Sequence, residues 1–171
     1  RLLLALWQGL RAAWLARHLQ LPLSQPYFTQ LQRDFGGLAT RLVLLPYSID
    51  TTPERRSAIE HTTSAHYGAG ARIDWQPTVP YGAQLPDLAI TPPAQAVLLL
   101  NLAATPESEI HGELLTQLRS RYGAASPVWL WAGDFAARNA GAPRRVEERT
   151  QLWQDFVVQN GLSTRLVSAG S

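Results

Sequence analysis

Polar side chains follow three segments dominated by apolar residues, and their types are those that bind ligands or take part in catalysis. The three apolar segments are residues 41–45, 96–102 and 128–131. Ser and Asp serve as nucleophiles or acid–base groups, whereas Tyr, Thr and Asn supply hydrogen bonds. The candidate ligand-binding residues that come with these segments are Tyr47, Ser48, Asp50, Thr52, Asn101, Thr105 and Asp134.

The loops after the first two apolar segments lack the features that phosphate chemistry requires. Neither 48–51 nor 102–105 contains glycine, so a close backbone cradle for a phosphate is disfavoured. The chain has no Lys, which removes the lysine of P-loops and of phospho-acceptor receiver domains. It has no Cys, which removes thiol nucleophiles and thiolate metal ligands. We therefore expect no nucleotide cofactor here.

No other set of residues completes a catalytic site in the sequence. A Ser-His-Asp triad drawn from Ser48, His61 and Asp134 lacks the Gly-x-Ser-x-Gly turn that supports such a nucleophile. His66 follows His61 at a spacing of five, which places the two on different faces of a helix and disfavours a shared metal. Asp50 and the neighbouring threonines have a plainer interpretation, because these residue types satisfy loop and helix-start amides. The sequence predicts no catalytic residue and no metal site.

Strands alternate with helices between residues 38 and 171, which predicts one α/β domain. Helices are expected at 53–67, 106–122 and 144–160, and strands at 41–45, 72–76, 96–102, 128–131 and 164–168. Two Thr-Pro-Glu sequences place a capping threonine, Thr52 or Thr105, before each of the first two helices. The second strand is the least apolar and belongs at a sheet edge. Right-handed crossovers then give a five-stranded, mostly parallel, Rossmann-like or flavodoxin-like sheet of order 2-1-3-4-5 with helices on both faces.

Two connections are expected to be irregular. Residues 77–93 contain five prolines and predict a long loop of the kind that covers functional sites. Residues 135–143 contain Asn139 and Gly141 and predict a second loop. In a sheet of this order, ligands bind beyond the carboxyl ends of the strands, where the strand order reverses. That position lies between the first and third strands, so the polar loops that follow them are expected to form a pocket.

Residues 1–37 differ from the rest of the chain and predict a helical N-terminal extension. Leu3, Trp7, Leu10 and Trp14 recur every three to four residues, which is helical spacing. The nearly apolar first ten residues, with the arginines that follow, fit two structures equally well. One is the cytoplasmic end of a transmembrane helix, and the other is an amphipathic helix packed on the domain. The chain does not begin with Met, which suggests a fragment of a longer protein.

The charge content points towards a partner surface rather than nucleic acid. Charged residues make up 16% of the chain, against about 25% in typical globular domains. Part of the surface is therefore expected to contact another molecule, although Gln, Ser and Thr can also supply solubility. The net charge is only +2, and the basic residues between Arg138 and Arg149 are interleaved with glutamates. We expect no nucleic-acid binding.

Two segments carry a family resemblance. AVLLLNLAATPESEIHGELLTQLRSRYG and VWLWAGDFAARNAGAPRRVEERTQLWQDFVVQNGL, preceded by a Trp-rich apolar helix, resemble the C-terminal cytoplasmic region of a bacterial membrane-protein family of unknown function. Members of that family are frequently encoded beside a Ras-like GTPase. The resemblance implies transmembrane helices in a missing N-terminal region, association with the inner membrane, a cytoplasmic position for this domain and a GTPase as partner. It brings no catalytic residues with it.

The sequence favours a non-catalytic α/β interaction domain of a bacterial membrane-associated protein that works with a protein partner. The low charge, the apolar amino end and the missing catalytic motifs motivate this interpretation. The alternative is a hydrolase or small-ligand-binding domain that uses a strand-end pocket around Asp50, Asn101 and Asp134.

Overall fold

A computed structural model describes residues 40–168, which fold around a five-stranded sheet in which every strand pair is parallel. The sheet order is β2-β1-β3-β4-β5, as the sequence predicts. The strands are β1 (Arg41–Pro46), β2 (Arg72–Trp75), β3 (Gln95–Asn101), β4 (Val128–Trp131) and β5 (Thr164–Val167). The predicted N-terminal extension, residues 1–37, lies outside the described residues.

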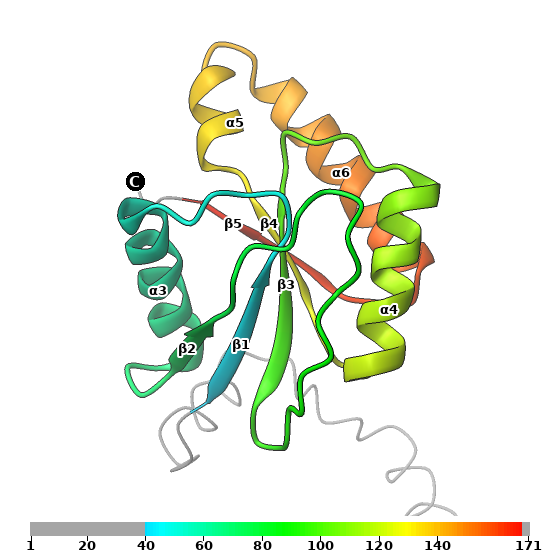
Figure 1. Cartoon of the computed structure of the whole chain (residues 1–171). Helices are drawn as coiled ribbons and strands as arrows, with labels where there is room; N and C mark the ends of the chain where they lie inside the picture. The colour runs from blue at the N-terminus through cyan, green and yellow to red at the C-terminus, as the bar shows by residue number, and fades with distance from the viewer. Residues whose placement is uncertain (1–39, 169–171) are drawn as a thin grey trace, which may run out of the picture. The chain divides into compact units, whose positions relative to one another are not determined.

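Helices lie on both faces of the sheet (Figure 1). Helix α3 (Pro53–Tyr67) covers one face, whereas α4 (Glu113–Tyr122) and α6 (Pro143–Gln159) cover the other. A short π-helical segment, η1 (Ser108–Gly112), leads directly into α4, and α5 (Gly133–Arg138) follows β4. Within residues 40–168, none of the helices combines the length and the apolar character needed to cross a membrane.

Alternation along the buried strands divides the core into two layers. Leu98 and Leu100 of β3 pack towards α4 and α6, while Leu99 packs towards α3. Strand β4 follows the same rule, since Leu130 joins the first layer and Trp129 the second. Both faces of β3 and β4 are covered, which explains why their sequences are continuous apolar runs rather than alternating ones.

Two local predictions are wrong. Thr52 caps α3 as predicted, accepting a hydrogen bond from the backbone N–H of Arg55. Thr105 caps nothing, because the second helix begins at Ser108 rather than at residue 106, and the Thr105 hydroxyl accepts from Arg149 instead. The segment predicted as a loop at 135–143 also contains most of α5, and only its last part is irregular.

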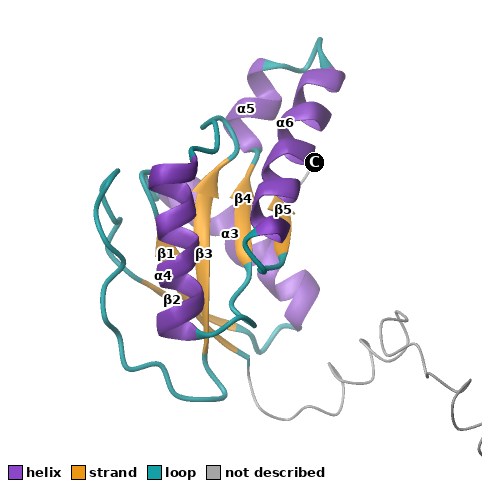
Figure 2. Ribbon diagram, turned by 90° about the vertical axis from the view of Figure 1, so that its right-hand side faces the viewer, coloured by secondary structure: helices purple, strands orange, loops and turns teal. Residues whose placement is uncertain are grey.

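Between β2 and β3 the chain forms no helix, in agreement with its proline content. We call this stretch, residues 76–94, the β2–β3 segment, and Figure 2 shows it running outside the sheet beside α4. Side chains of α4 hold it in place. Gln117 accepts from the backbone N–H of Leu85 at 2.9 Å, Arg121 donates to the Leu85 carbonyl, and the Tyr122 hydroxyl donates to the Pro86 carbonyl.

Candidate functional site

A cavity of about 300 Å³ opens where β1 and β3 end, which is the switch point of the sheet. We call it the strand-end cavity. Its wall comes from the loops after β1 and β3, from the start of the β2–β3 segment and from η1. The lining residues are Tyr47, Ser48, Tyr81, Leu100, Asn101, Ala104, Thr105, Glu107 and His111.

Four of the seven predicted candidates line this cavity, namely Tyr47, Ser48, Asn101 and Thr105. The other three do not. Thr52 is used as the α3 cap, as described above. Asp50 is exposed, and its backbone carbonyl accepts a hydrogen bond from Arg55. Arg55 also binds Asp134, so these residues tie the first loop to α5 instead of facing the cavity.

His111 is buried in the wall of the strand-end cavity, with 2% of its surface exposed. Its Nδ1 accepts from the backbone N–H of Glu107 at 3.1 Å. In this way the imidazole satisfies a free amide at the start of the helix, which is the role predicted for Thr105. Because Nδ1 is an acceptor, the proton of the neutral ring lies on Nε2. His111 therefore offers a hydrogen-bond donor to the cavity.

Aromatic rings surround His111 and explain its protonation behaviour. The ring lies edge-on to Trp153, with centroids 5.0 Å apart, and makes similar contacts with Tyr47 and Tyr81 at 6.0 and 6.2 Å. Burial among these rings lowers the pKa of His111, and the negative charge of Glu107 opposes that effect only in part. A neutral imidazole is thus the favoured form at neutral pH.

In the turn after β3, hydrogen-bond acceptors already receive bonds from within the domain. The Asn101 Oδ1 accepts from the backbone N–H of Ala103 at 2.9 Å, which leaves the side-chain amide hydrogens of Asn101 free to donate. The Ala104 carbonyl accepts from the Trp153 indole at 2.8 Å. Hydrogen-bond donors therefore predominate at this end of the cavity.

Arg149 of α6 binds three oxygen atoms of the same turn. Its Nη1 lies 3.1 Å from the Ala103 carbonyl, 2.9 Å from the Ala104 carbonyl and 3.0 Å from the Thr105 hydroxyl oxygen. Because the Thr105 oxygen accepts this bond, its own proton is left to donate. Arg149 thus turns the Thr105 hydroxyl into a donor and places a positive charge directly behind the turn.

The opposite rim is closed by Tyr81 and Glu107. The Tyr81 hydroxyl donates to the Glu107 carboxylate and lies 3.0 Å from both of its oxygens. Desolvation raises the pKa of the Tyr81 phenol, and the hydrogen bond and charge of Glu107 add to this rise. The phenol stays protonated at neutral pH, so the contact persists and occupies the carboxylate.

Ser48 adopts an unusual backbone conformation at the edge of the cavity. Its φ is +50°, in the left-handed region, and it is the one described residue other than glycine with a positive φ. A non-glycine residue pays about 1 kcal/mol or more for this geometry. Two hydrogen bonds hold the surrounding backbone, from Ser48 N–H to the Val79 carbonyl and from Val79 N–H to the Pro46 carbonyl, both 2.8 Å.

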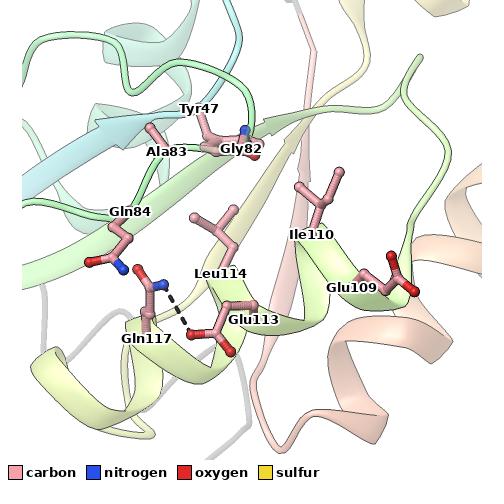
Figure 3. A pocket seen from close by; sticks show the side chains of 9 residues that line it. All are labelled: Tyr47, Gly82, Ala83, Gln84, Glu109, Ile110, Glu113, Leu114 and Gln117. Carbon is pink, nitrogen blue, oxygen red and sulfur yellow. Dashed lines mark hydrogen bonds between the residues drawn. The ribbon is translucent and has the colours of Figure 1, made fainter.

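A second cavity of about 380 Å³ lies beyond Tyr47, between the β2–β3 segment and the start of α4. Figure 3 shows Gly82, Ala83 and Gln84 on one side of it and the η1 and α4 side chains on the other. The Gln117 amide donates to Glu113 at 3.1 Å there. The same Gln117 side chain holds Leu85, so this cavity depends on the contacts that fix the β2–β3 segment.

Sequence reasoning missed Tyr81, Glu107 and His111 as members of the strand-end cavity. His111 lies beside three glutamates, a pattern typical of a solvated helix start. The Thr-Pro-Glu sequence at 105–107 predicts a helix start that is too early, and it gives no sign that the His111 ring receives the Glu107 amide. Among residues 40–168, no three His, Asp or Glu side chains gather in a way that could hold a metal ion.

The chain was compared with protein-family models, with curated proteins and with solved structures, and it matches none of them.

Proposed function

We propose that the α/β domain binds a small oxygen-bearing molecule in the strand-end cavity. The observation that carries this proposal is His111, which is almost fully buried, faces the cavity and has its Nε2 donor unused by any other described residue. A donor that opens onto a cavity can bind an acceptor of a ligand there. The position at the switch point of a parallel sheet supports the same function.

Binding fits the site better than catalysis does. A base for Ser48 would need a free ring nitrogen on His111, but Nδ1 is occupied by Glu107 and Nε2 carries the proton. The acids of the sequence-based alternative, Asp50 and Asp134, lie outside the lining. Of the sequence-based alternative, we therefore keep the small-ligand-binding domain and do not propose a hydrolase.

A thermal-shift screen tests the proposal. The panel consists of monosaccharides, short-chain carboxylic acids, their amides and nucleosides. At least one compound class should raise the melting temperature of the wild-type domain, and Ala104→Leu should remove the shift because the added side chain fills the cavity. Ala65→Leu, on the exposed side of α3, is the matched control and should keep the shift. A shift that survives in Ala104→Leu would contradict the proposal.

We also propose that the domain works with a protein partner, which the family resemblance implies is a GTPase. Two apolar side chains of α6 are available for contact with a partner, since Leu152 is 47% and Val158 is 62% exposed. Calorimetry with a Ras-like GTPase in its two nucleotide states should detect a complex that Leu152→Ser or Val158→Ser weakens. Absence of heat in both states would count against this partner. Attachment to the inner membrane, with the domain on the cytoplasmic side, stays a prediction.

A further inference from the structure

We infer that the group recognised in the strand-end cavity is a carboxylate, held by His111, Asn101 and Thr105 with the Arg149 guanidinium behind them. This inference rests on the proposed ligand-binding function and names the chemical class of the ligand. It follows from the donors, the charges and the shape of the cavity.

The first step is the imbalance between donors and acceptors. The His111 Nε2, the Asn101 amide and the Thr105 hydroxyl can each donate into the cavity, because the acceptor atom of each of these side chains already receives a hydrogen bond. The carbonyls of Ala103 and Ala104 are likewise occupied. An ionised carboxylate accepts hydrogen bonds and donates none. It can therefore pair with all of these donors, and no donor of the ligand would face a donor of the protein.

The second step is the charge of Arg149. Within residues 40–168, the ion pairs join Arg41 to Asp74 and Arg55 to Asp134, so no carboxylate lies within 4.0 Å of the Arg149 guanidinium. The side chain is half-buried and also lies over the Phe135 ring, with 5.6 Å between the guanidinium carbon and the ring centroid. A half-buried cation without an anion attracts a negative ligand group more strongly than a solvated one does.

The third step is the carboxylate of Glu107, which is the one acid in the lining. It would repel an anion, but it lies on the exposed rim, and the Tyr81 hydroxyl donates to it. Water screens an exposed charge far more than a half-buried one. The half-buried Arg149 behind the turn therefore opposes the repulsion from Glu107, whose carboxylate is exposed and already accepts from Tyr81.

The fourth step separates a carboxylate from a phosphate. Phosphate sites use successive backbone N–H groups in glycine-rich turns, whereas the turn at 101–105 has no glycine and directs its own Ala103 N–H to Asn101. The donors here are side chains, and the cavity of about 300 Å³ has the aromatic residues Tyr47 and Tyr81 in its wall. A small acid with a flat or apolar body fits this combination.

Calorimetric or NMR titrations with two matched pairs of probes test the inference. Acetate and benzoate carry the carboxylate, while acetamide and benzamide have nearly the same shape without the charge. At least one acid should bind the wild-type domain tenfold or more tightly than its amide and than inorganic phosphate. Arg149→Gln should remove most of that difference. Arg145→Gln, an exposed arginine four residues earlier on α6, is the matched control and should keep it.

A second variant is needed because the Arg149 side chain also binds the carbonyls of Ala103 and Ala104, so Arg149→Gln can disturb folding. Thr105→Val keeps the guanidinium and removes one donor, so it should weaken binding of the acid several-fold while the melting temperature shows a folded domain. An amide that binds as tightly as its acid, or a failure of both acids to bind, would overturn the inference. In either case, uncharged compounds that bind wild type but not Ala104→Leu would leave the proposed function standing.

Discussion

Arg55 donates to the Asp134 carboxylate across 2.6 Å, and this ion pair joins the start of α3 to the start of α5. The same arginine lies over the Trp131 ring and donates to the Asp50 carbonyl. The carboxylate of Asp134 is therefore bound to the framework, whereas Asp50 takes part through its backbone carbonyl.

Asp134→Asn should leave ligand binding in the strand-end cavity unchanged and should lower stability by less than about 1 kcal/mol, because the carboxylate is 47% exposed. Asp50→Asn should also leave binding unchanged. Urea unfolding and titration with the ligand found in the screen measure the two effects. A loss of binding in either variant would return these acids to the site.

The stability of the domain should fall as the pH drops below about 6.5. The pKa of His111 is lowered in the folded state by burial, so the unfolded chain binds more protons in the interval between the folded pKa and the ordinary value of 6.5. Stability rises with pH wherever the unfolded state binds more protons, and it is lost as the pH falls through that interval. Melting temperatures measured from about pH 8 to about pH 5 report the slope.

Two histidine variants test whether His111 causes this dependence of the melting temperature on pH. His111→Gln should lower the melting temperature at neutral pH but flatten its decline on the acid side. His61→Gln, which changes an exposed histidine of α3, should keep the wild-type decline. Equal slopes in wild type and His111→Gln would show that other groups cause the acid sensitivity.

Gly133→Ala should destabilise the domain by about 1–3 kcal/mol, the usual cost of overpacking. A Cβ atom at Gly133 would lie 2.5 Å from Cζ2 of Trp131, a buried side chain that cannot easily move away. Gly141→Ala is the control, since a Cβ there meets nothing within 4 Å. Chemical denaturation of both variants measures the difference, and equal stability of the two would contradict the predicted clash.

Ser48→Gly should raise stability by about 0.5 kcal/mol. Relief of the left-handed backbone contributes about 1 kcal/mol or more, and the added freedom of the unfolded chain offsets part of it. Ser57→Gly, in the exposed interior of α3, should instead lose about 0.5 kcal/mol. Opposite signs in urea unfolding would confirm that Ser48 is strained, whereas similar losses would rule the strain out.

The sheet could be predicted from the sequence because its signals are local and repeated. The apolar runs at β3 and β4 admit only strands buried on both faces, and the handedness of the crossovers then fixes the order. The start of α3 was equally accessible, because Thr52, Pro53 and Glu54 all agree with it.

The second Thr-Pro-Glu sequence predicts the wrong helix start because a residue distant in the chain binds its threonine. Thr105 is drawn to Arg149, 44 residues further on, and this contact competes with capping. His111 then caps the helix from inside it, which no sequence rule for helix starts anticipates. The polar part of the cavity was predictable as a location, but its donor groups depend on contacts between distant elements.

The β2–β3 segment is held to α4 by side chains rather than by a strand or helix of its own. The α4 side chains that hold residues 85 and 86 therefore help to set where the nearby Tyr81 lies relative to the cavity. Substitutions at Gln117, Arg121 or Tyr122 could reshape the binding site from a distance while the sheet stays intact. In evolutionary terms, the shape of the cavity can change through residues outside its lining, whereas His111 and Arg149 serve both the proposed binding and the fold.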